Sequence, residues 1–294
     1  MDNVMFRLNG VRLAYFHECL LLTNERIPAC ACTSGALFWD ENGLSKYLLF
    51  DVGYGVCESL ARYFVSENKV FTQTCLDGIL ITHAHLDHVA EIPIFIESYR
   101  RLQKCFRPIS IFCTQATFDI LNKIFGWLFQ SSKNTQPAAE WKKIEAGKSF
   151  NVGPFEIASI DASSHFSGAV NYLISFQKTK IFIGWDIRIP PAENILNILA
   201  NDSHLAFLEA NTMEDHPTGH CSARAILCWA LKAQLRNIVL VHYSGFEDGS
   251  ILTWRECQNM IPSLAPQMKK KNGYKITFGK QGDVFRFKNG LWTF

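Results

Sequence analysis

Several features typical of membrane, secreted and fibrous proteins are missing from this sequence of 294 residues. No apolar run reaches the roughly 18 residues that a transmembrane helix needs. The N-terminus lacks a basic segment followed by an apolar one, so no secretory leader is expected. None of the 10 cysteines forms a Cys-x-x-Cys pair, and this usage is typical of reduced thiols. We therefore expect a cytoplasmic protein without a membrane partner.

An excess of charge of one sign is also missing. The 29 lysines and arginines nearly balance the 27 aspartates and glutamates, which leaves a formal net charge of +2. Basic residues cluster only briefly, as in Lys269-Lys270-Lys271. Proteins that hold duplex nucleic acid or anionic lipid usually carry a basic excess or a basic stripe. Stable binding of nucleic acid is therefore not expected.

The composition favours a globular protein. Hydrophobic residues make up 48% of the chain and charged residues 19%, which excludes a disordered chain. The 18 glycines and 10 prolines follow no period, so a fibre is excluded as well. The length suits one large domain or two small ones, and no linker or internal repeat divides the chain. We predict a single domain over residues 1–294.

Short apolar segments alternate with segments of helical spacing along the whole chain, which predicts an α/β protein. The predicted strands are 4–16, 34–39, 46–51, 78–82, 109–113, 154–162, 168–177, 180–185, 204–209 and 237–242. The predicted helices are 56–66, 91–104, 115–130, a segment after Pro190-Pro191, and 222–235. The polar stretch Ser131–Ala138 is predicted to be a loop.

A cluster of histidines directly follows the predicted strand 78–82. It reads His83-Ala84-His85-Leu86-Asp87-His88, and a chance match to this pattern is on the order of a few in ten thousand. Imidazole and carboxylate are suitable ligands for Zn²⁺, Mn²⁺ and Fe²⁺. His83 and His85 can point together from the end of a strand, while Asp87 and His88 turn toward a second ion. The spacing predicts a two-metal site.

Three further residues could complete such a site, because each ends or directly follows a strand-like segment. They are His165, Asp186 and His242. A single polar residue at a strand end commonly has no special role. Three of them in this order after the histidine cluster favour the interpretation as metal ligands.

The order of these motifs resembles the five sequence motifs of the metallo-β-lactamase fold. The segment Phe50–Gly55 resembles the first aspartate–glycine turn of that superfamily. The resemblance implies a four-layer αββα sandwich. It implies one ion on His83, His85 and His165. A second ion is implied on Asp87, His88 and His242, with Asp186 as a ligand that bridges both ions. One departure is Ala90-Glu91, where many members have a glycine.

Two more segments resemble the ribonuclease Z-like phosphodiesterase branch of the superfamily. They are Leu205–Thr212 and Thr218–Ala223. The resemblance implies that His220 donates a proton to the leaving oxygen, that Glu209 orients His220, and that Asp87 helps to position a hydroxide bound to two metal ions. Two simpler interpretations stay open. Glu209 could form a surface ion pair, and the ring of His220 could be solvated beside Ser222, a candidate helix N-cap.

The interval between His165 and Asp186 bears on the substrate. Ribonuclease Z enzymes carry a long basic arm between these two motifs, whereas here they are 21 positions apart. Class II cyclic-nucleotide phosphodiesterases share the histidine core, including Leu86. We therefore predict a metal-dependent phosphodiesterase that hydrolyses a small phosphodiester, namely a 3′,5′-cyclic mononucleotide. The alternatives are a tRNA 3′-end endonuclease, a lactone or thioester hydrolase, and a non-enzymatic binding module.

The resemblance also carries expectations about cofactors and partners. It implies two divalent metal ions, with zinc expected and manganese as the alternative. Many members of this branch are homodimers, so a homodimer is expected here. Five aromatic residues lie near the motifs and could stack on a nucleobase, but aromatic residues make up 13% of the chain. The five residues are Trp127, Phe166, Tyr172, Trp185 and Tyr243. The sequence does not assign the stacking role to any one of them.

Overall fold

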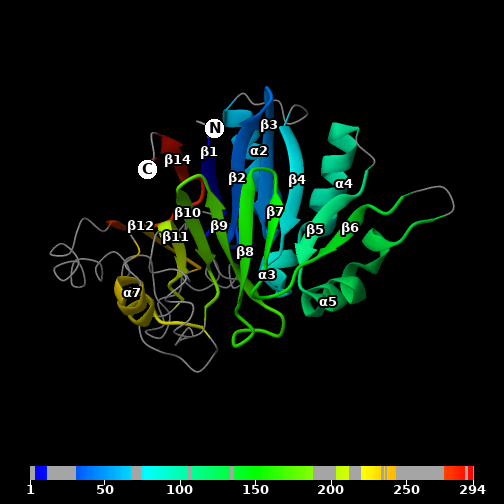
Figure 1. The fold of residues 1–294 in the computed structure, drawn as a ribbon. Helices are drawn as coiled ribbons and strands as arrows, with labels where there is room; N and C mark the ends of the chain where they lie inside the picture. Colours follow the sequence, from blue (N-terminus) through cyan, green and yellow to red (C-terminus); the bar gives the residue numbers. More distant parts are fainter. Residues whose placement is uncertain are drawn as a thin grey trace, which may run out of the picture.

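Two β-sheets face each other in the computed structural model of this protein (Figure 1). The structure describes residues 4–11, 31–67, 74–104, 107–132, 136–187, 203–211, 220–232, 235, 237–242, 275–288 and 291–293. Within these ranges, no helix is both long and apolar enough to span a membrane.

The first sheet has eight strands in the order β15-β14-β1-β2-β3-β4-β5-β6. They are β1 (Val4–Gly10), β2 (Ser34–Glu41), β3 (Leu44–Phe50), β4 (Thr74–Leu80), β5 (Ile109–Cys113), β6 (Ala139–Lys143), β14 (Val284–Lys288) and β15 (Leu291–Thr293). Strands β3 to β6 run parallel. The β2–β3 turn is Asn42-Gly43, and both residues have a positive φ, as a tight two-residue hairpin turn requires.

The second sheet has seven strands in the order β13-β12-β11-β10-β9-β8-β7. They are β7 (Ser149–Val152), β8 (Phe155–Asp161), β9 (Val170–Phe176), β10 (Thr179–Gly184), β11 (Ser203–Glu209), β12 (Asn237–Val241) and β13 (Lys275–Phe278). Strands β10 to β13 run parallel, whereas β7 to β10 are antiparallel neighbours.

Helices cover the outer face of each sheet. Helices α2 (Val56–Ser66), α4 (Ile92–Gln103) and α5 (Gln115–Phe125) pack on the first sheet, and α7 (Ala223–Lys232) packs on the second. In the central core, Phe6 stacks on Phe207 with 4.4 Å between the ring centroids. Burial of such aromatic rings supplies much of the hydrophobic stabilisation. The four-layer αββα sandwich is confirmed.

Some element boundaries differ from the sequence prediction. The first strand ends at Gly10 rather than at residue 16, and residues 12–16 lie outside the described ranges. The helix predicted over 115–130 ends at Phe125, and the 3₁₀ turn η2 (Gly126–Phe129) follows, because glycine weakens a helix. The short helix α3 (Leu86–Val89) lies inside the histidine cluster. The helix expected after Pro190-Pro191 falls outside the described residues.

Five strands were not predicted: β6, β7, β13, β14 and β15. Each has only three to five residues, at or below the short end of the roughly 4–8 residues over which alternation is read. Strands β6, β13 and β14 pair with strands that are distant in the chain, whereas β7 and β15 pair with the neighbouring strands β8 and β14. Strand β14, for example, pairs with β1 through the register of Val4 with Phe287.

Candidate metal centre

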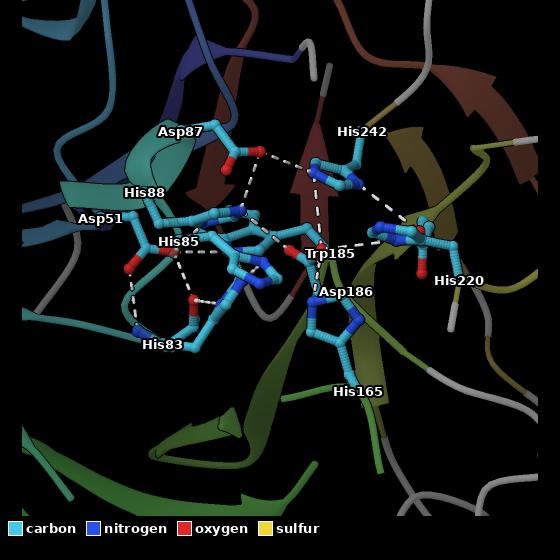
Figure 2. Close-up of polar contacts among 12 residues, drawn as sticks. Asp51, His83, His85, Asp87, His88, His165, Trp185, Asp186, His220 and His242 are labelled. Carbon is cyan, nitrogen blue, oxygen red and sulfur yellow. Dashed lines mark hydrogen bonds and ion pairs between the residues drawn. The ribbon is translucent and has the colours of Figure 1, made fainter. Parts of the chain in front are cut away.

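The candidate ligands converge because they follow the carboxyl ends of strands that meet at one edge of the sandwich (Figure 2). In the first sheet, β3 and β4 run parallel, and the histidine cluster follows β4. In the second sheet, β8, β10 and β12 run in one direction. His165, Asp186 and His242 follow these three strands in turn. Parallel strands thus place residues that are distant in the sequence at one site.

Three cross-sheet hydrogen bonds hold the two sheets together at this edge. The hydroxyl of Tyr172 donates to the carbonyl of Ile81 at 2.7 Å. The amide of Val170 donates to the carbonyl of Thr82 at 2.9 Å. The indole of Trp185 donates to Oδ2 of Asp51 at 2.9 Å. The relative position of the ligands therefore depends on buried polar contacts between the sheets.

The first ligand group contains His83, His85 and His165. Each offers one ring nitrogen, and these atoms lie within 4.8 Å of one another. Nε2 of His83 lies 2.9 Å from Nδ1 of His85. Burial lowers the pKa of both His83 and His85, so both rings are neutral at neutral pH. The neutral ring is the form whose lone pair can bind a metal ion.

The second ligand group contains Asp87, His88 and His242, again with ligand atoms within 4.8 Å of one another. Oδ2 of Asp87 lies 3.5 Å from Nε2 of His88 and 3.5 Å from Nε2 of His242. Burial opposes ionisation of Asp87, but the two histidines outweigh it and hold the pKa of this carboxyl well below its usual value. The carboxylate is therefore ionised over the whole physiological range.

Asp186 lies between the two groups. Its Oδ2 is 3.1 Å from Nε2 of His88, and its Oδ1 is 3.5 Å from Nε2 of both His165 and His242. Burial opposes its charge, but the surrounding histidines keep the pKa of Asp186 well below its usual value. Asp186 therefore has the position and charge of a ligand shared between two cations.

Asp51 and Thr82 orient the ligand rings from behind. Oδ2 of Asp51 lies 2.9 Å from Nδ1 of His88 and accepts a 2.7 Å hydrogen bond from the hydroxyl of Thr82. The same hydroxyl lies 3.0 Å from Nδ1 of His83. Because the Thr82 hydroxyl donates to Asp51, it accepts from the His83 ring. Both histidines then carry the proton on Nδ1 and leave Nε2 for a metal ion.

Several buried atoms of this centre lack an ordinary partner. Among the described residues, Nε2 of His88, Nε2 of His242 and both carboxylate oxygens of Asp186 make no hydrogen bond. Burial opposes the charge of His242, but Asp186, Asp87 and Glu209 raise its pKa to about 10. A divalent cation would replace such protons and satisfy the orphaned atoms. The donor set of imidazoles and carboxylates therefore fits divalent metal ions.

Among the described residues, the groups that could hold a metal ion contain no cysteine. Cys32 is buried near Asp87, and burial together with this carboxylate raises the pKa of its thiol to about 12. The thiol is therefore protonated at neutral pH, a form that is a poor metal ligand.

Glu209 and His220 form a hydrogen-bonded pair beside the two groups. Oε1 of Glu209 accepts from Nδ1 of His220, and Oε2 accepts from the amide of Ile187 at 2.8 Å. Nδ1 of His220 also lies 3.7 Å from Oδ1 of Asp186. Glu209 is fully buried, which excludes a surface ion pair.

The hydrogen bond to Glu209 also affects the charge of His220. Burial opposes this charge, but the bond to Glu209 outweighs it and raises the pKa of His220 above its usual value. The ring is 18% exposed, so it can still meet a substrate. The hydroxyl of Ser222 accepts from the amide of Ala225 at 3.1 Å and caps α7. Ser222 is therefore the N-cap of α7, while the neighbouring His220 pairs with Glu209.

Sequence reasoning missed the contact of Glu91 with helix α2. The carboxylate of Glu91 accepts from the amides of Gly55 at 2.8 Å and Cys57 at 2.9 Å, at the N-terminus of α2. A negative charge is favourable there. Ala90 has right-handed helical dihedral angles, so this turn needs no glycine. The Ala90-Glu91 pair, where many members have a glycine, therefore provides a clasp, meaning the hydrogen bonds from the Glu91 carboxylate to the loop before α2.

The sequence indicates Asp51 only as part of a turn and gives no sign of its contacts to His88, Thr82 and Trp185. A signal for the residue itself was present, since it follows an apolar strand and precedes Gly53 and Gly55. Its φ of 54° is unusual for a residue other than glycine, and such strained positions cluster at functional sites.

Fold and site together define a protein of the αββα class with a candidate two-metal centre at one edge of its sheets. The family model described as "Beta-lactamase superfamily domain" matches residues 46–243. The chain therefore belongs to this superfamily, which is a superfamily of metal-dependent hydrolases.

Among curated proteins, ribonuclease Z of Bradyrhizobium diazoefficiens is 28% identical over 142 residues, which cover 48% of this chain and 44% of that protein. The chain thus matches less than half the length of this relative.

Two solved structures show the same fold at low identity. The metallo-β-lactamase fold protein YhfI from Bacillus subtilis has a TM-score of 0.68 and 16% identity, with 97% of this chain and 100% of that chain covered. A diphosphatase from the PhnP family has a TM-score of 0.70 and 14% identity, with 97% of each chain covered.

Proposed function

We propose that this protein is a metal-dependent phosphodiesterase that hydrolyses a small cyclic phosphodiester, namely a 3′,5′-cyclic mononucleotide. We further propose that one divalent ion binds to His83, His85 and His165, and a second to Asp87, His88 and His242, with Asp186 shared. When bound, such ions, with zinc expected, neutralise phosphoryl charge and lower the pKa of a water molecule. The remaining chemistry belongs to the protein's own side chains.

The hydrogen bond between His220 and Glu209, next to Asp186, carries this proposal. When a phosphodiester is hydrolysed, one ester oxygen departs from phosphorus as an alkoxide. An alkoxide is a poor leaving group unless an acid protonates it. Glu209 raises the pKa of His220, which favours the protonated ring. Such an acid typically contributes 10²–10⁴-fold to the rate. A lactone or thioester hydrolase would need this donor much less.

Asp87 is proposed to position the attacking water. Its side chain is largely buried, but 12% of it remains exposed to solvent, and its carboxylate is held ionised by His88 and His242. An ionised carboxylate accepts a hydrogen bond and can orient the water toward phosphorus.

The segment between His165 and Asp186 supports a small substrate. All of it is described, and β9, a two-residue turn and β10 take up most of it. The interval has no room for a tRNA-binding arm of the kind that the resemblance places there. The similarity to ribonuclease Z of B. diazoefficiens favours tRNA 3′-end processing as the second candidate.

Turnover on a panel of substrates tests the proposal. The panel contains 3′,5′-cyclic AMP, GMP, CMP and UMP, bis-p-nitrophenyl phosphate and a precursor tRNA, each with zinc and with manganese. We expect cleavage of a cyclic mononucleotide by the wild type and no activity for His85→Ala. Cleavage of the tRNA alone would replace the proposal with the second candidate.

The role of His220 is tested with two leaving groups. His220→Ala should bind metal normally but cleave the cyclic nucleotide about 10²–10⁴-fold more slowly, since the alkoxide then leaves unprotonated. The loss on bis-p-nitrophenyl phosphate should be much smaller, because p-nitrophenolate needs little protonation. Equal losses on both substrates would argue against proton donation by His220.

A further inference from the structure

One aromatic side chain lies against the metal centre without being fully buried. The ring of Phe166 packs on His85 with 4.3 Å between centroids and an interplanar angle of 58°, and its centroid lies 5.9 Å from that of His83. Phe166 is only partly buried. Part of this ring is therefore open to solvent beside a proposed ligand.

The other aromatic residues near the motifs have different positions. Tyr172 and Trp185 are fully buried, and each donates a hydrogen bond to the site from within the sandwich. Trp127 is 54% exposed, but it lies on η2, which follows the end of α5. The turn that contains Phe166 contacts the start of α5 instead. Tyr243 is outside the described residues. Of the described candidates, Phe166 alone has a partly exposed ring on a proposed ligand.

The backbone around Phe166 is held in place by several hydrogen bonds. The carbonyl of Gly168 accepts from the hydroxyls of Thr114 at 2.7 Å and Thr117 at 3.3 Å, at the start of α5. The carbonyl of Phe166 accepts from the amide of Ala169 at 2.9 Å. Gly168 has a φ of 77°, and a Cβ there would lie 2.5 Å from that of Ala116. The turn is therefore tightly packed, and the ring is pre-positioned.

The two sides of the centre differ in chemistry. On the His85 side lie Phe166 and Leu86, whose side chain is 63% exposed. Glu209 and His220 lie beside His242. The ring centroid of His220 is 4.7 Å from that of His165, away from the ring of Phe166 on His85. One side thus offers a proton donor and the other an apolar surface that gains from contact with a flat, apolar group.

We infer that Phe166 is a specificity-determining residue that stacks on the nucleobase of the substrate. This inference rests on the proposed function and names its substrate class as a cyclic phosphate that carries a heterocyclic base. The apolar ring beside His85 then holds the base, while the phosphodiester lies at the proposed ligands and the leaving oxygen faces His220. A base-free sugar phosphate has nothing to place on this ring.

The test compares two substrates that differ only in the base. They are adenosine 3′,5′-cyclic phosphate and the 3′,5′-cyclic phosphate of methyl riboside. Phe166→Leu keeps the apolar volume but removes the flat face, and Phe166→Tyr restores it. Phe166→Leu should raise KM for the adenosine compound by about 5- to 150-fold, the equivalent of roughly 1–3 kcal/mol for one stacked base. Its KM for the base-free compound should not change, and Phe166→Tyr should resemble the wild type.

Controls separate this role from a loss of structure. Metal content and thermal midpoint should be the same in the wild type and Phe166→Leu, and Trp127→Leu should affect neither substrate. An equal change on both substrates, or no change on either, would overturn the inference while leaving the phosphodiesterase proposal intact. If the wild type cleaves a different cyclic mononucleotide of the panel, that compound replaces the adenosine compound in this test. If the wild type cleaves none of the four, the proposed function is wrong and this inference falls with it.

Discussion

Oδ2 of Asp51 lies 2.9 Å from Nδ1 of His88, and neither side chain is exposed to solvent. The same oxygen accepts hydrogen bonds from Thr82 and Trp185. One carboxylate therefore orients His88 directly and His83 through the hydroxyl of Thr82. These two histidines belong to different ligand groups, so a single residue supports both halves of the candidate centre.

Asp51→Asn is predicted to weaken metal binding. The amide lacks the negative charge that holds the proton on Nδ1 of His88, and loss of such a partner typically costs 10–100-fold in metal affinity. Zinc affinity is measured by competition with a chromophoric chelator. Asp77→Asn is the matched control, because Asp77 is a partly buried carboxylate that pairs with Lys46 at 3.5 Å. Wild-type affinity in folded Asp51→Asn would contradict this account.

Removal of metal is predicted to destabilise the protein. Without cations, the buried carboxylates Asp87 and Asp186 are balanced only by protonated histidines. A ligand at 100 times its dissociation constant stabilises the native state by about 2.7 kcal/mol. Dialysis against a chelator should therefore lower the thermal midpoint by roughly 5 °C or more. Elemental analysis should find about two ions per chain before dialysis. An unchanged midpoint after complete removal would count against a buried metal centre.

The pH dependence of turnover should reveal the bond between Glu209 and His220. Proton donation requires protonated His220, and Glu209 raises the pKa of this ring. Activity should therefore fall as the pH rises through that raised pKa. Glu209→Gln removes the charge that favours the imidazolium, so the alkaline fall should move to lower pH. The profile of kcat against pH measures this shift, and an unmoved alkaline limb would exclude the assigned role.

Glu91→Ala is predicted to destabilise the loops around the site. The substitution removes the acceptor of the Gly55 and Cys57 amides at the start of α2. Two such charge-assisted bonds at a partly buried position are worth about 1–3 kcal/mol in the free energy of unfolding. Urea denaturation measures the loss. Glu97→Gln, on the solvent side of α4, is the control and should stay within about 0.5 kcal/mol of the wild type. A similar small effect for Glu91→Ala would show that the clasp is dispensable.

Local patterns explain why the fold class and the candidate ligands could be predicted. His83, His85, Asp87 and His88 lie within six positions, and His165, Asp186 and His242 each follow an apolar strand. Strand ends and short motif spacings are local properties, so they appear in the sequence without any knowledge of packing. Strand β14 was missed because its partner β1 is distant in the chain, and β15 was missed because it has only three residues and pairs with β14.

Residue type and spacing were enough to predict the α/β class, the candidate ligands and the resemblance to phosphodiesterases. How side chains meet across the sandwich depends on the packing of the two sheets. Trp185 reaches Asp51 across 134 positions, and Glu91 reaches Gly55 across 36. This packing also separated Phe166, partly exposed on His85, from aromatic residues buried in the core. Such contacts arise from the packing of two sheets, and no local propensity encodes them.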